Sequence, residues 1–384
     1  MLLGRLAASM LAVTLILFVL ARYHSPQLAG LTLFLAIFPG LVVSPIAGAL
    51  LDRQGRARLI VLDYVIAAIT VLLIALLSAG HELPPVLLLV IVAISSLTNP
   101  LSNAGNRSLF PIVAPRHLWE RANALDSSAF LLSSIVGAPV AGTLVSWIGP
   151  EWALGIVGVL FAISALAIFQ FRDPSPRSSG TESILGQAWQ GLIYVLRNPT
   201  LRGLAMSCTT YNVSWGILEI AVPVLLLGRL HETAATVGYV WGAMGVAGLL
   251  SALATGRVKT QGRERQLMLG SIIVGAVAMA ILPFASSVAL VAVAVIGVGI
   301  ANGPFDIGMF TLRQRRTDPA WFGRAFAVSM SLNFAGMPVG AALAGPLVGW
   351  SINVAFGAAA VVALVSAVFP LWMIPREEGL PVSP

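Results

Sequence analysis

Residues 58–79 read RLIVLDYVIAAITVLLIALLSA, a stretch in which Arg58 and Asp63 are the only charged side chains. A helix needs about 20 apolar residues to cross the hydrocarbon core of a bilayer, which is about 30 Å thick. This stretch therefore predicts a membrane-spanning helix. Asp63 then lies at membrane depth, where an ionisable group is a candidate for function.

Eleven more stretches of spanning length share this character and are separated by short polar or Gly/Pro breaks. The twelve predicted helices cover 3–22, 28–50, 58–79, 84–108, 123–147, 152–171, 201–228, 236–255, 267–284, 287–311, 325–348 and 353–374. Arg5 precedes the first stretch as in a secretory leader, but no small-x-small cleavage pattern follows Leu20, so we expect this helix to be retained. The sequence predicts an all-α polytopic membrane protein with 12 transmembrane helices.

The composition supports this class and excludes others. Hydrophobic residues make up 58% of the chain and charged residues 10%, against about 25% charged in an average soluble domain. A soluble globular protein, a disordered chain and a disulfide scaffold are excluded. The net charge of +7 does not indicate nucleic-acid binding, because Lys259 is the only lysine and no basic run alternates with aromatic residues. Cys208 is the only cysteine, so no intramolecular disulfide can form, and we expect neither metal nor cofactor.

The positions of the basic residues predict the orientation. If the N-terminus lies inside the cell, all of the 22 Lys and Arg residues except Arg22 and Arg229 fall in segments on the cytoplasmic side. Cytoplasmic loops are enriched in these residues. We therefore expect both termini in the cytoplasm, and the arginine-rich, lysine-poor usage indicates a bacterial plasma (inner) membrane.

The longest polar break, residues 172–200, leaves six predicted helices on each side. Within it, apolar residues recur at helical spacing, which predicts an amphipathic helix on the membrane surface. The stripe comprises Leu185, Ala188, Trp189, Leu192, Ile193 and Leu196. We expect an N-terminal six-helix bundle (1–171), a cytoplasmic linker with this surface helix (172–200), a C-terminal six-helix bundle (201–376) and a cytoplasmic tail (377–384).

The two halves repeat one another weakly. A shift of 203 residues places RANA at 121–124 on RAFA at 324–327 and AGTLVSW at 141–147 on AGPLVGW at 344–350. The same shift pairs Asn99 with Asn302 and Asn103 with Asp306. Internal repeats of this kind are typical of secondary transporters.

Residues 48–58, GALLDRQGRAR, lie between the second and third predicted helices, where they resemble the loop signature of the major facilitator superfamily. Residues 191–202, GLIYVLRNPTLR, with segments around 106–113 and 122–125, are similar to its branch of enterobactin-type siderophore exporters and macrolide-efflux proteins. The resemblance covers essentially the whole chain. It implies two pseudo-symmetric six-helix bundles around a central cavity, and transport by alternating access.

The loop signature supplies a candidate gate, which comprises Gly48, Asp52, Arg53, Gly55 and Arg56. The resemblance implies that this cluster latches the two bundles on the cytoplasmic side. From the residues alone, Asp52 suits a helix N-terminus, and Arg53 and Arg56 could pair with Glu120 or Asp126. The alternative is that the arginines only fix the topology.

Two further sets of residues predict helix bends. Gly137, Pro139 and Gly142 resemble an element that the superfamily associates with exporters, and Pro338 and Gly340 occupy the equivalent place in the second half. Proline leaves a backbone carbonyl without its helical donor, and glycine allows helices to cross closely. Ordinary close packing explains these residues equally well.

Four carboxyl groups within the predicted helices are proton-coupling candidates: Glu219, Asp306, Asp126 and Asp63. Asp63 and Asp126 fall near the cytoplasmic ends of their helices, where pairing with a loop arginine is the favoured role. Glu219 has no basic residue within a helical turn and is the first candidate, with a cavity-lining role as the alternative. The fourth helix carries no mid-membrane arginine, so proton coupling would depend on Glu219 or Asp306.

Polar residues near helix breaks predict the substrate cavity. Breaks are expected at Asn99-Pro100 and across 301–305, because irregular backbone at membrane depth is tolerated where it lines a cavity. The candidate lining residues are Asn99, Asn103, Asn302, Tyr211, Asn212 and Trp215. This polar and aromatic mixture suits an amphipathic solute better than a hexose.

The sequence therefore predicts a monomeric secondary exporter of a drug-like or siderophore-like small molecule, driven by proton antiport. An ion-coupled importer of a metabolite and a non-transporting receptor or scaffold are the alternatives. An intramembrane enzyme is disfavoured, because no zinc-ligand pair or Ser/Lys dyad occurs and the four histidines fall in four different loops. No phosphate-binding loop of the ATPase type is present.

Overall fold

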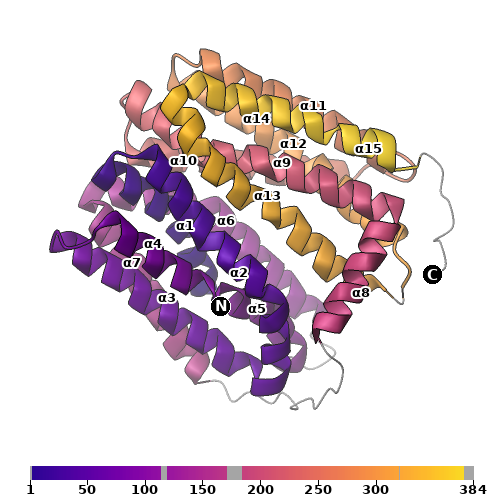
Figure 1. Ribbon diagram of the computed structural model, residues 1–384, viewed down its shortest axis with the longest axis horizontal. Helices are drawn as coiled ribbons and strands as arrows, with labels where there is room; N and C mark the ends of the chain where they lie inside the picture. The colour runs from indigo at the N-terminus through magenta and orange to yellow at the C-terminus, as the bar shows by residue number, and fades with distance from the viewer. Residues whose placement is uncertain (1, 114–118, 171–183, 320, 376–384) are drawn as a thin grey trace. The chain divides into compact units, whose positions relative to one another are not determined.

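The computed structural model describes residues 2–113, 119–170, 184–319 and 321–375, which contain helices and no β-strand (Figure 1). The helices are α1 (Leu2–Tyr23), α2 (Pro26–Gln54), α3 (Arg56–Ala79), α4 (Pro85–Ser96), α5 (Asn99–Val113), α6 (Trp119–Ile148), α7 (Pro150–Phe169), α8 (Ile184–Arg197), α9 (Pro199–Val224), α10 (Ala234–Gly256), α11 (Glu264–Ile281), α12 (Val288–Arg315), α13 (Phe322–Trp350), α14 (Ile352–Ser366) and α15 (Val368–Met373). A π-helical turn, Leu225–Arg229, continues α9, and a 3₁₀ turn, Leu282–Phe284, continues α11.

Twelve helical segments in the described residues are long and apolar enough to cross a membrane, as predicted. The fourth span combines α4 and α5, the seventh combines α9 with the π-helical turn, and the twelfth combines α14 with α15. Short polar side chains cap the N-terminal ends of α2 and α9. Ser25 accepts a hydrogen bond from the backbone N–H of Leu28, and Asn198 accepts one from Thr200, each just before a proline in the first turn.

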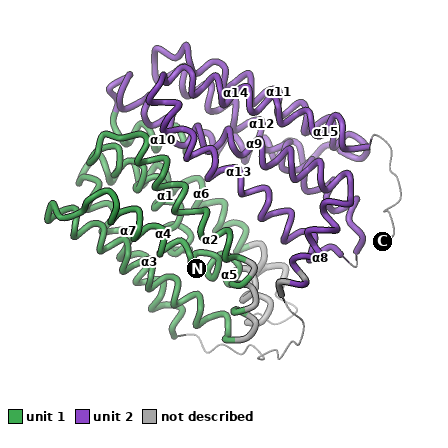
Figure 2. Tube along the Cα trace, viewed as in Figure 1, with its two compact units in different colours: residues 1–184, 233–242 green, residues 185–232, 243–384 purple. Residues whose placement is uncertain are grey.

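The chain forms two compact units, shown in Figure 2. Unit 1 comprises residues 1–184 and 233–242, and unit 2 comprises 185–232 and 243–384. The first residues of α10 therefore belong to unit 1 and the rest of α10 to unit 2. This division differs from the predicted one, which treated 172–200 as a separate linker; residues 171–183 and 376–384 lie outside the described part of the chain.

Helix α8 belongs to unit 2 because it is bound to the segment between α12 and α13. The ring of Tyr194 stacks on Trp321 at 5.0 Å, and its hydroxyl accepts a hydrogen bond from the backbone N–H of Asp318. The amide of Asn198, which follows α8, donates to the backbone carbonyl of Arg316 at 3.0 Å. Trp189 and Leu196 of the predicted apolar stripe remain exposed.

The two predicted helix breaks have different outcomes. An interruption at Leu97 and Thr98 separates α4 from α5, as expected next to Pro100. The break expected across 301–305 is wrong, since α12 stays helical through Pro304. Proline at this position cannot donate to the carbonyl of Ile300. The hydroxyl of Ser251 on α10 donates to that carbonyl instead, at 2.6 Å, and the helix continues.

Candidate functional site

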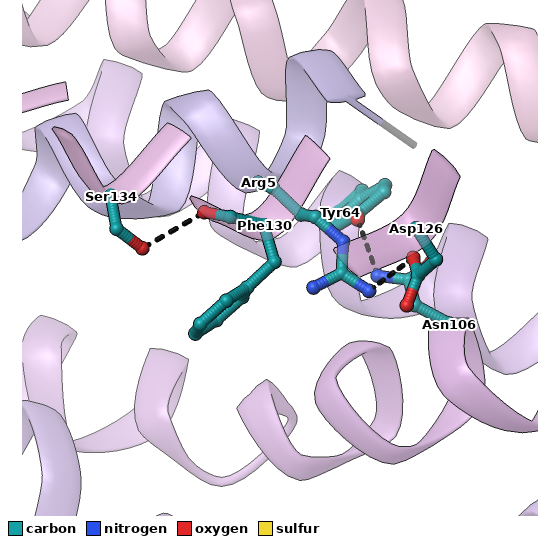
Figure 3. Close-up of polar contacts among 6 residues, drawn as sticks. All are labelled: Arg5, Tyr64, Asn106, Asp126, Phe130 and Ser134. Carbon is teal, nitrogen blue, oxygen red and sulfur yellow. Dashed lines mark hydrogen bonds and ion pairs between the residues drawn. The ribbon is translucent and has the colours of Figure 1, made fainter. Parts of the chain in front are cut away.

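An ion pair between the first and sixth helices of unit 1 lies within a mostly buried polar cluster (Figure 3). Arg5 on α1 donates to a carboxylate oxygen of Asp126 on α6 at 2.5 Å, and the two side chains are 11% and 15% exposed. The guanidinium also lies over the ring of Phe130, 5.5 Å from its centre. Asp126 is paired with an arginine, as favoured, but this arginine lies in the first turn of α1 and not in a loop.

A second polar pair packs beside this one in unit 1. Asn106 on α5 donates to the hydroxyl of Tyr64 on α3 at 2.9 Å, and both residues are buried (Figure 3). Gly4 on α1 makes room for the phenol, because a Cβ there would overlap its hydroxyl oxygen. Sequence analysis did not single out Tyr64 or Asn106, since a lone tyrosine or asparagine within an apolar run has no distinguishing pattern.

Asp63 is buried on α3, and the hydroxyl groups of Thr98 and Ser102 lie near its carboxyl group. Thr98 lies in the interruption between α4 and α5, and Ser102 lies in the first turn of α5. A carboxylate beside the first turn of a helix interacts favourably with the helix dipole. Asp63 therefore lies beside the interruption that precedes Asn99, and within the described residues it forms no ion pair with an arginine.

Two carboxyl groups occupy membrane-spanning helices of unit 2. Glu219 lies on α9, four residues before Pro223, and Asp306 lies on α12, two residues after Pro304. Glu219 is partly buried and Asp306 is exposed. Within the described part of the chain, neither carboxylate has a hydrogen bond or ion pair. The helix around Glu219 is irregular, because Pro223 cannot donate to the carbonyl of Glu219 and a π-helical turn follows.

The six predicted cavity residues divide into two groups. Asn99 and Asn103 are exposed on one face of α5 and hydrogen-bonded to each other at 3.0 Å, and Trp215 and Asn302 are partly buried. The remaining two, Tyr211 and Asn212, instead form contacts between α9 and its neighbouring helices. Tyr211 is 2% exposed and packs on Phe305 of α12, with ring centres 4.9 Å apart. Asn212 donates to the backbone carbonyl of Asn333 on α13 at 2.9 Å.

The predicted gate lies at the junction of α2 and α3. Gly55 separates these helices with φ 95°, a backbone conformation that favours glycine. Arg56 is the first residue of α3. The surroundings of Gly48 and the side chains of Asp52 and Arg53 lie outside the described part of the structure. The latch remains a prediction.

The predicted bend residues lie at close helix contacts. Pro139 and Pro338 are inside α6 and α13, which both continue through them. A Cβ at Gly142 would overlap the backbone carbonyl of Ala234 at the start of α10, and one at Gly340 would overlap the carbonyl of Val213 on α9. Gly137 packs similarly against Ser9 of α1. Gly137, Gly142 and Gly340 therefore lie at close helix contacts, and their role in a bend or in export remains a prediction.

Sequence analysis also missed Arg313 on α12, which it counted only as a topology arginine. This side chain is 1% exposed and is the largest of the fully buried side chains among the described residues. Those residues contain no group of three or more His, Cys, Asp or Glu side chains that could hold a metal ion.

Twelve spanning helices with carboxyl groups inside them define a multi-pass membrane protein of the transporter class. The family model of the Major Facilitator Superfamily matches residues 1–330 and 213–384. The chain belongs to this superfamily, and it is a membrane transporter for a small molecule and not an enzyme.

Several relatives and one solved structure extend this comparison. The MFS-type transporter y4rN of Sinorhizobium fredii is 38% identical over 99% of this chain and 94% of its own length. The multidrug efflux pump Tap of Mycolicibacterium fortuitum is 28% identical over 83% of this chain and 80% of its own. The enterobactin exporter EntS of Shigella boydii is 25% identical over 84% and 77%. The solved nucleoside transporter NupG shares the fold, with a TM-score of 0.76 at 14% identity over 97% of this chain and 95% of its own.

Proposed function

We propose that this transporter is a secondary exporter that moves an amphipathic, drug-like or siderophore-like molecule out of the cell in exchange for protons. Two relatives, the efflux pump Tap and the exporter EntS, support the outward direction of transport. The polar and aromatic side chains that are exposed or partly buried on α5, α9 and α12 support an amphipathic solute: Asn99, Asn103, Trp215 and Asn302.

Proton coupling is supported by two carboxyl groups within membrane-spanning helices, those of Glu219 and Asp306. Neither has a cation partner among the described residues. A carboxyl group in such a place can be held in its neutral form and release its proton when water reaches it. Asp126 is less suited to this task, because it already binds Arg5. Glu219 is the first coupling residue and Asp306 the second.

The proposed setting is the plasma (inner) membrane of a bacterium, with both termini in the cytoplasm and the chain working as a monomer. The distribution of arginine supports this orientation, since only Arg22 and Arg229 fall on the other side. Alternating access, in which the substrate site opens to one side of the membrane at a time, is the mechanism proposed for the exchange.

The test begins with a thermal-shift screen of the purified protein against a catechol siderophore, a macrolide and a lipophilic dye. The compound that shifts the unfolding temperature is then offered to inside-out vesicles that contain a lumenal pH dye and an acidic lumen. We expect the solute to accumulate in the lumen while the lumen becomes more alkaline. Glu219→Gln should abolish both effects and keep the thermal shift, whereas Glu82→Gln, in an exposed loop, should change neither.

Three results would contradict parts of the proposal. Uptake only into vesicles of the opposite orientation would make the protein an importer. Binding without movement in either orientation would indicate a receptor. Proton exchange that is unchanged in both Glu219→Gln and Asp306→Asn would remove these carboxyl groups from the coupling.

A further inference from the structure

Arg313 is a buried cation that forms no ion pair with the described residues. Its guanidinium lies over two phenyl rings, that of Phe310 on the same helix at 5.7 Å and that of Phe326 on α13 at 5.5 Å. With the amide of Asn333 oriented to satisfy its neighbours, its oxygen accepts from the Nη2 of Arg313 at 2.7 Å. In the described part of the chain, the Nε and Nη1 atoms have no hydrogen-bond partner. An arginine stays charged in proteins, and a buried charge without a partner is strongly destabilising.

Among the described acids of unit 2, Asp306 is the candidate anion on the same helix as Arg313, since Glu232 and Asp318 have other interactions and Glu219 lies eleven residues along α9 from Cys208. Glu264 on α11 is already paired with Arg315 at 2.5 Å. Asp306 lies seven residues before Arg313, and this spacing places both residues on nearly the same face of α12, about 10.5 Å apart along its axis. Arginine side chains on a helix lean toward its N-terminus, which is the direction of Asp306.

The strip of α12 between the two charges is lined by Met309 and Phe310. Cys208 on α9 lies against this strip, with its sulfur 3.2 Å from that of Met309, and it is within electrostatic range of both Asp306 and Arg313. Of the described neighbours, α9 also contributes Tyr211 and α11 contributes the paired Glu264, whereas α13 contributes Asn333 and Ser329, which do not titrate.

We propose that Arg313 is the positioning residue for the Asp306 carboxyl group. When Asp306 loses its proton to water, the guanidinium moves along α12 past Cys208 and pairs with the carboxylate. When Asp306 takes up a proton again, Arg313 returns to the site formed by Phe310, Phe326 and Asn333. The assignment of this movement to transport rests on the proposed proton coupling, but the pairing itself can be tested without any substrate.

Cys208 is a native reporter for this movement, because it is the only cysteine of the chain and is buried next to the strip. The experiment measures the rate of Cys208 modification by N-ethylmaleimide in the purified protein from about pH 5 to about pH 8, by mass spectrometry. At the upper end we expect Arg313 beside the thiol in the wild type, where its charge favours the reactive thiolate. Asp306→Asn removes both the carboxylate, which opposes the thiolate, and the movement of Arg313, so it should change the rate there and leave it nearly unchanged at the lower end.

A double-variant comparison decides the outcome. The effect of Arg313→Gln on the rate should be smaller in the Asp306→Asn background than in the wild type, because the guanidinium then has no carboxylate to move toward. Arg316→Gln is the matched control, since it removes an arginine from the end of the same helix without breaking a described ion pair, and it should leave the rate unchanged. If Arg313→Gln does not fold, Arg313→Lys is used, which should retain part of the effect.

Two results would overturn the inference. In the first, the two substitutions change the rate of Cys208 modification independently, so that the double variant shows the product of the single effects. In the second, the wild type and Asp306→Asn react at equal rates throughout the pH range. The result is separate from the vesicle experiment. Proton-driven efflux together with multiplicative effects would refute only the role of Arg313. Coupled labelling without proton-driven efflux would refute only the proposed antiport.

Discussion

Arg5 and Asp126 lie 121 residues apart in the chain and form one ion pair that ties α1 to α6 within unit 1. Little of either side chain is exposed, so each charge depends on the other for compensation. Removing one partner of a largely buried pair leaves the other charge unpaired, which is more destabilising than removing both. This relationship assigns Asp126 a structural task.

We expect Asp126→Asn to lower the free energy of unfolding by about 3 kcal/mol, because Arg5 loses its counter-charge. Arg5→Gln should have a similar effect. The double variant should be more stable than the sum of the single effects predicts, and the measurement is thermal unfolding of the four proteins in one detergent. Strictly additive losses would show that the two side chains do not stabilise each other.

The twelve spans were predictable because each one requires only local sequence, namely a long apolar run between polar breaks. The partner of Asp126 was not predictable, since the contact between α1 and α6 depends on helix packing across 121 residues. The burial of Arg313 was missed for the same reason. An arginine at the end of an apolar run has the same local pattern whether it faces water or packs beneath Phe326.

The continuity of α12 shows a different limit of sequence-based prediction. Gly303 and Pro304 favour a break when the helix is considered alone. The hydroxyl of Ser251 on α10 supplies the hydrogen bond that proline cannot give, and only the fold brings it to the carbonyl of Ile300. Tyr211 is a similar case, because an aromatic residue beside polar ones predicts a cavity, yet its ring packs on Phe305.

The role of Ser251 leads to a second prediction. Ser251→Ala should lower the free energy of unfolding by about 1–3 kcal/mol, since it leaves the carbonyl of Ile300 without a donor. In a Pro304→Ala background, the N–H of the new alanine can bond to Ile300, and the same serine substitution should have little effect. Thermal unfolding of the four proteins measures this difference. An equal loss in both backgrounds would mean that Ser251 acts through some contact other than this carbonyl.

The attachment of α8 to unit 2 leads to a third prediction. Tyr194→Phe removes the acceptor for the Asp318 N–H but keeps the stacking on Trp321, whereas Tyr194→Ala removes both. We expect faster hydrogen exchange in α8 for both variants, and a larger increase for alanine. Exchange in α14, which lies elsewhere in unit 2, is the internal control. No change in α8 for Tyr194→Ala would show that Asn198 and the buried residues of α8 suffice to hold it.

A substitution at Gly142 can distinguish the two explanations for the glycines of α6, which are close helix packing and an export-specific role. A Cβ at this position would overlap the carbonyl of Ala234, so Gly142→Ala should force α6 and the start of α10 apart within unit 1. The matched control is Gly155→Ala on α7, where a Cβ would have no described atom within 4 Å. If glycine serves close packing, Gly142→Ala lowers the unfolding temperature and the yield of folded protein, and Gly155→Ala changes neither. A Gly142→Ala protein with the wild-type unfolding temperature but without efflux would instead support the export-specific role, because transport would then require something of Gly142 that folding does not.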